Sequence, residues 1–154
     1  MIKVLFVCHG NICRSPMAEF IMKDKIRKLS LDKAFLVDSR ATSTEEIGNN
    51  IYPKAINTLK KHGIFNASHT AKQITFVDYN YFDYIFIMDK ANLRMLKYVL
   101  PGCDLKKVLM IGEMLAKDLE IEDPWYSDNF EKVYSQLDNA IKIFIEKIIQ
   151  EEII

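Results

Sequence analysis

Apolar stretches alternate with amphipathic stretches along most of the chain. Residues 2–8 are nearly all apolar and rich in β-branched and aromatic side chains, which is typical of a strand buried on both faces of a parallel sheet. After a Gly-Asn turn, Ser15 and Pro16 are typical of a helix N-cap and a first helical residue. Apolar residues then recur at helical spacing to about residue 29, so the chain is expected to open with a strand, a turn and a helix.

The same alternation continues toward the C-terminus. Further strands are expected at residues 34–37, 84–88 and 107–111, and further helices at 54–62, 90–100 and 129–150. Strands alternating with helices predict an α/β domain with a mainly parallel sheet, and such folds bind ligands at the carboxyl ends of their strands. The polar segment after Asp38 and Ser39, to about residue 52, is expected to be a long loop beside the site.

Composition and charge narrow the class of protein. A chain of 154 residues, 49% of them hydrophobic, fits one globular domain over residues 1–154. Basic and acidic side chains balance at 21 each, without the basic excess of a nucleic-acid binder. No run is long enough to cross a membrane, and no signal peptide is evident. The odd set of Cys8, Cys13 and Cys103 is not typical of a secreted disulfide scaffold, so a cytoplasmic location is expected.

The segment between the first strand and the first helix carries the strongest chemical signal. It runs from Cys8 to Arg14 as Cys-x5-Arg, where free backbone N–H groups and the positive end of a helix dipole point into the loop. Gly10 and Asn11 are the residues best able to take the positive φ angles of a tightly curled loop. Arg14 can hold two phosphate oxygens, and the same positive surroundings stabilise a thiolate at Cys8. We therefore expect a nucleophile aimed at a bound phosphorus, with Ser15 donating to the sulfur when it leaves.

A general acid is expected at Asp123. Because the pKa of tyrosine is near ~10, a phenolate is a poor leaving group and its efficient release needs a proton donor. Asp123 lies in an irregular stretch, and Pro124 restricts it to an extended backbone. Trp125 and Tyr126 offer rings that can stack on an aryl substrate. Taken alone, this segment is more typical of a surface Asp-Pro turn, and the Cys-x5-Arg pattern alone also fits a buried cysteine.

These motifs occur together in one known family. The chain resembles the low-molecular-weight protein tyrosine phosphatases in blocks that cover almost its whole length in the expected order. The matching blocks are residues 4–16, 37–39, 41–43, 47–48, 61–64, 68–74, 82–85, 88–93 and 121–126. The most specific feature is the extended loop motif with an Asp-Pro-aromatic segment downstream.

The resemblance implies a fold and a reaction. The expected fold is a three-layer sandwich with a four-stranded, mainly parallel sheet flanked by helices. The expected reaction is metal-independent hydrolysis of phosphotyrosine, and of small aryl phosphates, through a phosphocysteine on Cys8. In it, Arg14 binds the phosphate and Asp123 acts first as acid and then as base. No cofactor is implied, and we expect a monomer that acts on phosphotyrosine proteins or peptides and binds neither nucleic acid nor membrane.

The resemblance also implies the surrounding site residues. Ser39 and His69 are expected to brace the loop. The expected substrate-binding residues are His9, Gly10, Asn11, Ile12, Cys13, Ser15, Trp125 and Tyr126. Cys13 has a second implied role as a resolving thiol, because an oxidised Cys8 could be trapped by it as a reversible disulfide. A small buried side chain is the alternative interpretation of Cys13.

Three positions depart from the family pattern. His9 stands where an apolar residue is usual, and Arg40 replaces a small residue. Glu45 stands where many relatives have an aromatic residue, and Glu46 follows it. An acidic lip of this kind is expected to disfavour acidic peptides around the phosphotyrosine, which a comparison of acidic and basic phosphopeptides would test.

Two other functions fit part of the sequence. Thioredoxin-coupled arsenate reductases share a similar fold and loop, but they relay a disulfide through two further cysteines, and here only Cys103 lies downstream. A non-catalytic phosphate- or phosphotyrosine-binding module would keep Arg14 and lose the nucleophile or the acid. Both Cys8 and Asp123 are present, which favours the enzyme.

Overall fold

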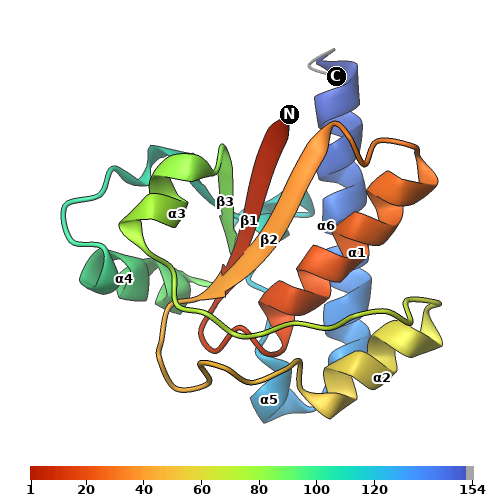
Figure 1. Ribbon diagram of the computed structural model, residues 1–154, viewed down its shortest axis with the longest axis horizontal. Coiled ribbons are helices and arrows are strands. Elements are labelled where there is room, and N and C mark those ends of the chain that lie inside the picture. The colour runs from red at the N-terminus through yellow and green to blue at the C-terminus, as the bar shows by residue number, and fades with distance from the viewer. Residues whose placement is uncertain (152–154) are drawn as a thin grey trace.

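Four parallel strands form the centre of the protein, whose computed structural model describes residues 1–151. Their order is β2-β1-β3-β4, so β1 lies inside the sheet (Figure 1). The strands are β1 (Ile2–Cys8), β2 (Phe35–Ala41), β3 (Tyr84–Ile87) and β4 (Val108–Met110). The apolar run of β1 suits this place, because an interior strand of a parallel sheet is covered on both faces.

Helices cover both faces of the sheet. One face carries α1 (Arg14–Lys28), α2 (Pro53–Lys61) and α6 (Phe130–Gln150), and the other carries α3 (Phe76–Tyr81) and α4 (Lys90–Val99). Alternate residues of β1 supply the two cores: Val4 and Phe6 join the first, and Leu5 and Val7 join the second. This arrangement confirms the expected three-layer sandwich, with a sheet that is parallel throughout. Short helical turns are η1 (Leu105–Lys107), η2 (Ile111–Met114) and α5 (Pro124–Ser127).

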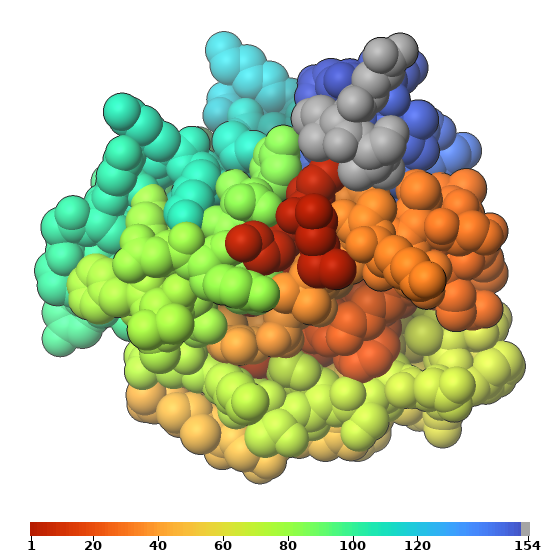
Figure 2. All heavy atoms as spheres, turned by 45° about the horizontal axis from the view of Figure 1, so that its top comes forward, coloured from red at the N-terminus to blue at the C-terminus, as the bar shows by residue number. Residues whose placement is uncertain are grey.

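The two ends of the sheet have different roles. The N-terminal residues and the end of α6 lie together at the amino ends of the strands, on the face that Figure 2 shows. The carboxyl ends of the strands point away from that face, toward α2 and α5 (Figure 1). Within residues 1–151, no helix combines the length and the apolar character needed to cross a membrane.

The start of α1 differs from the expectation. The helix begins at Arg14 instead of Pro16, and Cys13 occupies the N-cap position without a capping bond from its side chain. Ser15 is no cap, because its hydroxyl lies within hydrogen-bonding distance of Cys8 and Asn11 instead. The first turn of α1 therefore has no side-chain cap of its own, and its free N–H groups remain available to an anion in the adjoining loop.

Strand β2 is longer than the expected residues 34–37. Its pairing with β1 continues to Ala41, which lies opposite Cys8, and Ser39 lies opposite Phe6. The expectation is wrong here because polar residues replace the apolar run at Asp38, although the backbone stays extended. Ser39 is thereby fixed on the sheet beside the last residues of β1, and the long polar loop begins only after Ala41.

The helices α3 and α5 were not expected from the pattern. Each is too short to show helical periodicity, and α3 is marked instead by a capping box between Thr75 and Asp78. Asp123, expected in an irregular stretch, is the N-cap of α5. The remaining expected strands and helices agree with the structure to within one residue at each end.

Candidate active site

A curled loop joins the carboxyl end of β1 to the first turn of α1. Asn11 adopts the left-handed conformation with φ of 59°, as expected, whereas Gly10 has no positive φ, so the expectation for Gly10 is wrong. With Asn11 in this conformation, its backbone N–H donates to Sγ of Cys8 at 3.3 Å. The loop therefore bends around the sulfur at the end of β1.

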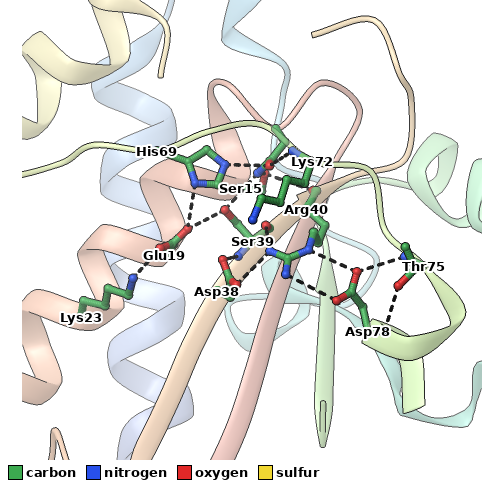
Figure 3. Close-up of polar contacts among 11 residues, drawn as sticks. Ser15, Glu19, Lys23, Asp38, Ser39, Arg40, His69, Lys72, Thr75 and Asp78 are labelled. Carbon is green, nitrogen blue, oxygen red and sulfur yellow. Dashed lines mark hydrogen bonds and ion pairs between the residues drawn. The ribbon is translucent and has the colours of Figure 1, made fainter. Parts of the chain in front are cut away.

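A buried hydrogen-bond network lies behind the loop (Figure 3). Nδ2 of Asn11 donates to Oγ of Ser15 at 2.8 Å and to Oγ of Ser39 at 2.9 Å. Nε2 of His69 lies 2.7 Å from Oδ1 of Asn11. Ser39 in turn donates to Oε1 of Glu19 at 2.6 Å. The two residues expected to brace the loop, Ser39 and His69, thus both contact Asn11.

The network places a hydroxyl beside the sulfur of Cys8. Oγ of Ser15 accepts from Asn11, and its own hydrogen can point at Sγ of Cys8, 3.0 Å away, or at the carbonyl of Arg40 at the longer distance of 3.4 Å. Burial lowers the pKa of His69, although Glu19 opposes the shift, and a neutral ring with its proton on Nε2 satisfies Oδ1 of Asn11. Cys8 therefore faces two donors, the Asn11 amide and the Ser15 hydroxyl, an arrangement that stabilises a thiolate.

Two members of this region had no expected role. Glu19 is only 3% exposed, and it forms an ion pair with Lys23 in addition to its bond from Ser39. Arg40, noted only as a departure from the family pattern, pairs with Asp38 on its own strand and with Asp78 of α3 (Figure 3). No role for Glu19 could be assigned from the sequence, because its burial within α1 and its contact with Ser39 arise only in the folded structure.

Arg14 is held from the far side of the loop. Its Nη1 donates to Oδ2 of Asp89 at 2.6 Å and to the carbonyl of Ile121 at 2.8 Å. Burial opposes its charge, but Cys8, Asp89 and Asp123 together raise the pKa of Arg14. The guanidinium is therefore a fixed cation beside the sulfur. Asp89 belongs to a block that matches the family, yet nothing in its spacing assigns it to this role.

Asp123 stands across the loop from Cys8, at the start of α5. Its Oδ1 accepts from the Trp125 N–H at 3.0 Å, and its Oδ2 lies 3.5 Å from Nη2 of Arg14. Tyr52, which the sequence did not single out, packs edge-on against Trp125 with ring centroids 4.8 Å apart. Trp125 and Tyr126 remain 52% and 86% exposed, so their rings are available to a ligand at the rim.

These side chains surround a pocket of about 140 Å³. Its lining residues are Cys8, His9, Gly10, Ile12, Cys13, Arg14, Glu45, Glu46, Asp123, Trp125 and Tyr126. The expected nucleophile, clamp and acid thus share one pocket with most of the expected substrate-binding residues. Asn11 and Ser15 do not line it, because both are fully buried in the supporting network.

A histidine and a glutamate contact each other at the rim. Nε2 of His9 lies 3.0 Å from Oε2 of Glu45, and both side chains are substantially exposed. Glu46 is also engaged, because it accepts from Nδ2 of Asn49 at 2.6 Å. One carboxylate of the expected acidic lip therefore contacts His9, another of the positions that depart from the family pattern.

Cys13 and Cys8 are both free thiols in the structure. Burial raises the pKa of Cys13, and the nearby Cys8 and Asp123 raise it further. Cys13 is thus a neutral thiol beside a cysteine whose surroundings stabilise a thiolate. Cys103 belongs elsewhere, because it packs against the core on the α3 and α4 side of the sheet, whereas Cys8 joins the core on the α1 side.

Comparison with known proteins agrees with this geometry. The family model described as low molecular weight phosphotyrosine protein phosphatase matches residues 3–153. A protein of that name from Schizosaccharomyces pombe is 40% identical over 152 residues, which cover 96% of this chain and 97% of the relative. The chain belongs to the low molecular weight phosphotyrosine protein phosphatase family.

Solved structures share the whole fold. The crystal structure of YfkJ from Bacillus subtilis has a TM-score of 0.90 and 34% identity, with 98% of this chain and 96% of that chain covered. DARP, named as a Drosophila arginine phosphatase, has a TM-score of 0.86 and 33% identity, with 95% and 97% covered. The second name raises the question of which phosphorylated side chain this pocket accepts.

Proposed function

We propose that the protein hydrolyses phosphotyrosine in proteins and peptides, with Cys8 as nucleophile, Arg14 as phosphate clamp and Asp123 as proton donor. The observation that carries the proposal is the setting of Cys8. Its sulfur accepts a hydrogen bond from the Asn11 backbone N–H and faces the Ser15 hydroxyl. The pocket that contains this sulfur is also lined by Arg14 and Asp123. These are the parts that in-line phosphoryl transfer to sulfur needs, with charge stabilised by fixed donors.

In the first step the phosphate dianion lies against the loop N–H groups and Arg14. The Cys8 thiolate attacks phosphorus, the S–P bond forms, and the bond from phosphorus to the phenolic oxygen breaks. Asp123 transfers its proton to that oxygen, so that tyrosine leaves as the neutral phenol. Asp123 is suited to this role, because it lies at the rim and only its Oδ1 is held by the α5 backbone.

In the second step water hydrolyses the phosphocysteine. The ionised Asp123 now takes a proton from the water, the new P–O bond forms, and the S–P bond breaks. Ser15 stabilises the departing thiolate through its hydroxyl, whose oxygen lies 3.0 Å from Sγ. Inorganic phosphate is released, and the thiolate and the acid are ready for another turnover.

The walls of the pocket favour an aryl phosphate. Ile12 offers an apolar side chain to the substrate, while Trp125 and Tyr126 offer aromatic rings at the rim. A phenyl ring gains from both kinds of contact. A phosphoguanidinium would lose water from its polar N–H groups on the apolar wall, so phosphoarginine is the less favoured substrate.

A comparison of phosphopeptides tests this choice. In the presence of a metal chelator, the protein is expected to hydrolyse p-nitrophenyl phosphate and a phosphotyrosine peptide. Matched phosphoserine and phosphoarginine peptides are expected to react roughly 100-fold more slowly, since the loss of apolar contacts in a hydrophobic pocket changes kcat/KM by about 10–200-fold. Faster release of phosphate from the phosphoarginine peptide would assign the protein to the other activity.

The proposed function also bears on the location, the oligomeric state and the binding partners of the protein. We infer a cytoplasmic monomer that binds neither nucleic acid nor membrane. A reducing compartment keeps Cys8 available as a thiolate. The 21 basic and 21 acidic side chains leave no basic excess, which a protein that binds a polyanion would normally have. Arsenate reduction by a disulfide relay is not favoured, because Cys103 lies on the opposite side of the sheet from Cys8.

Cys13 is proposed to protect the nucleophile from irreversible oxidation. A sulfenic acid on Cys8 can be attacked by the neighbouring Cys13, with loss of water and formation of a disulfide. Peroxide-inactivated protein is therefore expected to recover most of its activity with a dithiol, whereas Cys13→Ser is expected to recover far less. Recovery that is equal in the two proteins would contradict this role and leave Cys13 as a buried packing residue.

A further inference from the structure

A second hollow adjoins the phosphate pocket on the side of α4. It has about 250 Å³ of space and is lined on one side by Ala91, Asn92 and Met95 of α4 and by Asp89, the N-cap of that helix. Its remaining lining residues also line the phosphate pocket; they are His9, Arg14, Asp123 and Tyr126. The two spaces are therefore neighbours that share a wall.

The acceptor oxygens that α4 and its N-cap bring to this hollow already have partners. Oδ2 of Asp89 accepts from Arg14, and its Oδ1 accepts from the Asn92 N–H at 2.9 Å. Asn92 is only 2% exposed, and its Oδ1 accepts from the backbone N–H groups of Met88 and Asp89. These bonds occupy the side-chain oxygens of Asp89 and Asn92, so the apolar surface that α4 offers to a guest is the side chains of Ala91 and Met95.

We propose that this hollow binds an aliphatic side chain, such as leucine, from a residue close to the phosphotyrosine in the substrate. The proposal rests on the proposed function, because the shared wall joins the hollow to the pocket where phosphotyrosine binds. Tyr126 borders both spaces and is 86% exposed, so it lies where the substrate backbone crosses from one to the other. A residue next to the phosphotyrosine thus contacts α4, and this contact makes the rate depend on the substrate sequence.

Size and charge limit the guest. A volume of about 250 Å³ is smaller than the roughly 300–1,000 Å³ of sites for drug-sized ligands, so one side chain suits it better than a separate small molecule. An acidic side chain would face the carboxylates of Asp89 and Asp123, because the Arg14 guanidinium that also lines the hollow is already paired with both. A basic side chain would find the Asp89 carboxylate already paired with Arg14. An uncharged aliphatic side chain contacts Met95 and Ala91 without electrostatic repulsion and without the loss of an ionic partner.

The test is a set of phosphotyrosine peptides that carry leucine, alanine or glutamate at one position at a time, on either side of the phosphotyrosine. We expect leucine to exceed alanine by about tenfold in kcat/KM at one of these positions, which is the scale of one or two methylene groups in an apolar site. Glutamate is expected to be the poorest there. The variant Ala91→Phe, which fills the hollow, is expected to bring leucine and alanine to within about twofold of each other.

The peptide rates of each variant are divided by the rate of the same variant on p-nitrophenyl phosphate. This small substrate does not extend beyond the phosphate pocket, so its rate reports the chemistry alone. Met95→Ser provides a second route, because it removes apolar surface without adding bulk, and it is also expected to reduce the leucine preference. Tyr98→Ala is the matched control on α4, since Tyr98 is 81% exposed and lies outside the lining of both spaces. It is expected to keep the wild-type preference.

The outcomes separate the two proposals. Equal rates for leucine and alanine peptides at every position, with normal turnover of all of them, would overturn the hollow as a binding site and leave the phosphatase activity intact. A leucine preference that survives in both Ala91→Phe and Met95→Ser would also overturn it, because the preference would arise elsewhere. Absence of turnover on every aryl phosphate would instead reject the proposed function on which this site rests.

Discussion

Replacing Cys8 by serine is expected to lower turnover of phosphotyrosine by at least ~10⁴-fold, in line with the ~10⁶-fold losses seen when the nucleophile of another hydrolase is removed. The physical reason is the state of the attacking atom. The Asn11 amide, the Ser15 hydroxyl and the start of α1 are arranged to stabilise a thiolate, and a hydroxyl gains much less from them because it stays protonated near neutral pH. The measurement is release of phosphate from a phosphotyrosine peptide by Cys8→Ser.

The loss in Cys8→Ser should be a loss of chemistry rather than of structure. Serine is close to cysteine in size, so the buried position is expected to tolerate it, and the loop with Arg14 should still bind inorganic phosphate. Cys103→Ser is the control, since Cys103 packs on the other side of the sheet and is expected to keep full activity. Turnover by Cys8→Ser above about one per cent of wild type would exclude Cys8 as the nucleophile, because it corresponds to a barrier increase of less than about 3 kcal/mol.

The layers of the fold could be predicted because they depend on local apolar pattern. Strand β1 is apolar except for Lys3, and α6 presents a buried stripe from Val133 to Ile148, so each element is visible in a short window. The continuation of β2 through Asp38, Ser39 and Arg40 could not be seen in this way. Those residues are extended because they pair with β1, and their polar side chains contact the loop and α3, which only the tertiary structure brings near.

The residues of the candidate site also divide into those that a local motif predicts and those that depend on tertiary contacts. Cys8 and Arg14 are close in sequence, so their chemistry follows from one loop, and the Asp-Pro-aromatic segment has its own motif. Asp89, Glu19 and Tyr52 were not assigned, because each acts on a residue far away in the chain: Asp89 on Arg14, Glu19 on Ser39, and Tyr52 on Trp125. Contacts of this kind leave no spacing that a single sequence can show.

Replacing Asp123 by asparagine is expected to lower kcat/KM for phosphotyrosine by about 10²–10³-fold, within the range for loss of a general acid. Asparagine is as good an N-cap as aspartate, so the bond from the Trp125 N–H to the start of α5 is expected to survive. What disappears is the proton for the phenolic oxygen. The substitution therefore isolates the chemical role of Asp123 from its structural role.

The leaving group provides the sharpest measurement of this role. A nitrophenol is a much stronger acid than tyrosine, so it leaves more easily without a proton, and kcat/KM reports the first step, in which that bond breaks. The loss in Asp123→Asn is therefore expected to be several-fold smaller for p-nitrophenyl phosphate than for phosphotyrosine. Asp123→Ala should show the same dependence together with a stability loss of about 1 kcal/mol from the missing cap.

The control for Asp123→Asn lies in the same segment. Asp128 has a left-handed backbone with φ of 59°, which asparagine also tolerates, and it forms an exposed ion pair with Lys54. Asp128→Asn is therefore expected to fold normally and to keep both activities. If Asp123→Asn lost the same factor on the two substrates, Asp123 would be positioning Arg14, whose Nη2 lies 3.5 Å away, instead of protonating the leaving group. The proton donor would then have to be sought elsewhere on the rim, where His9 and Tyr126 are further titratable side chains shared by both spaces.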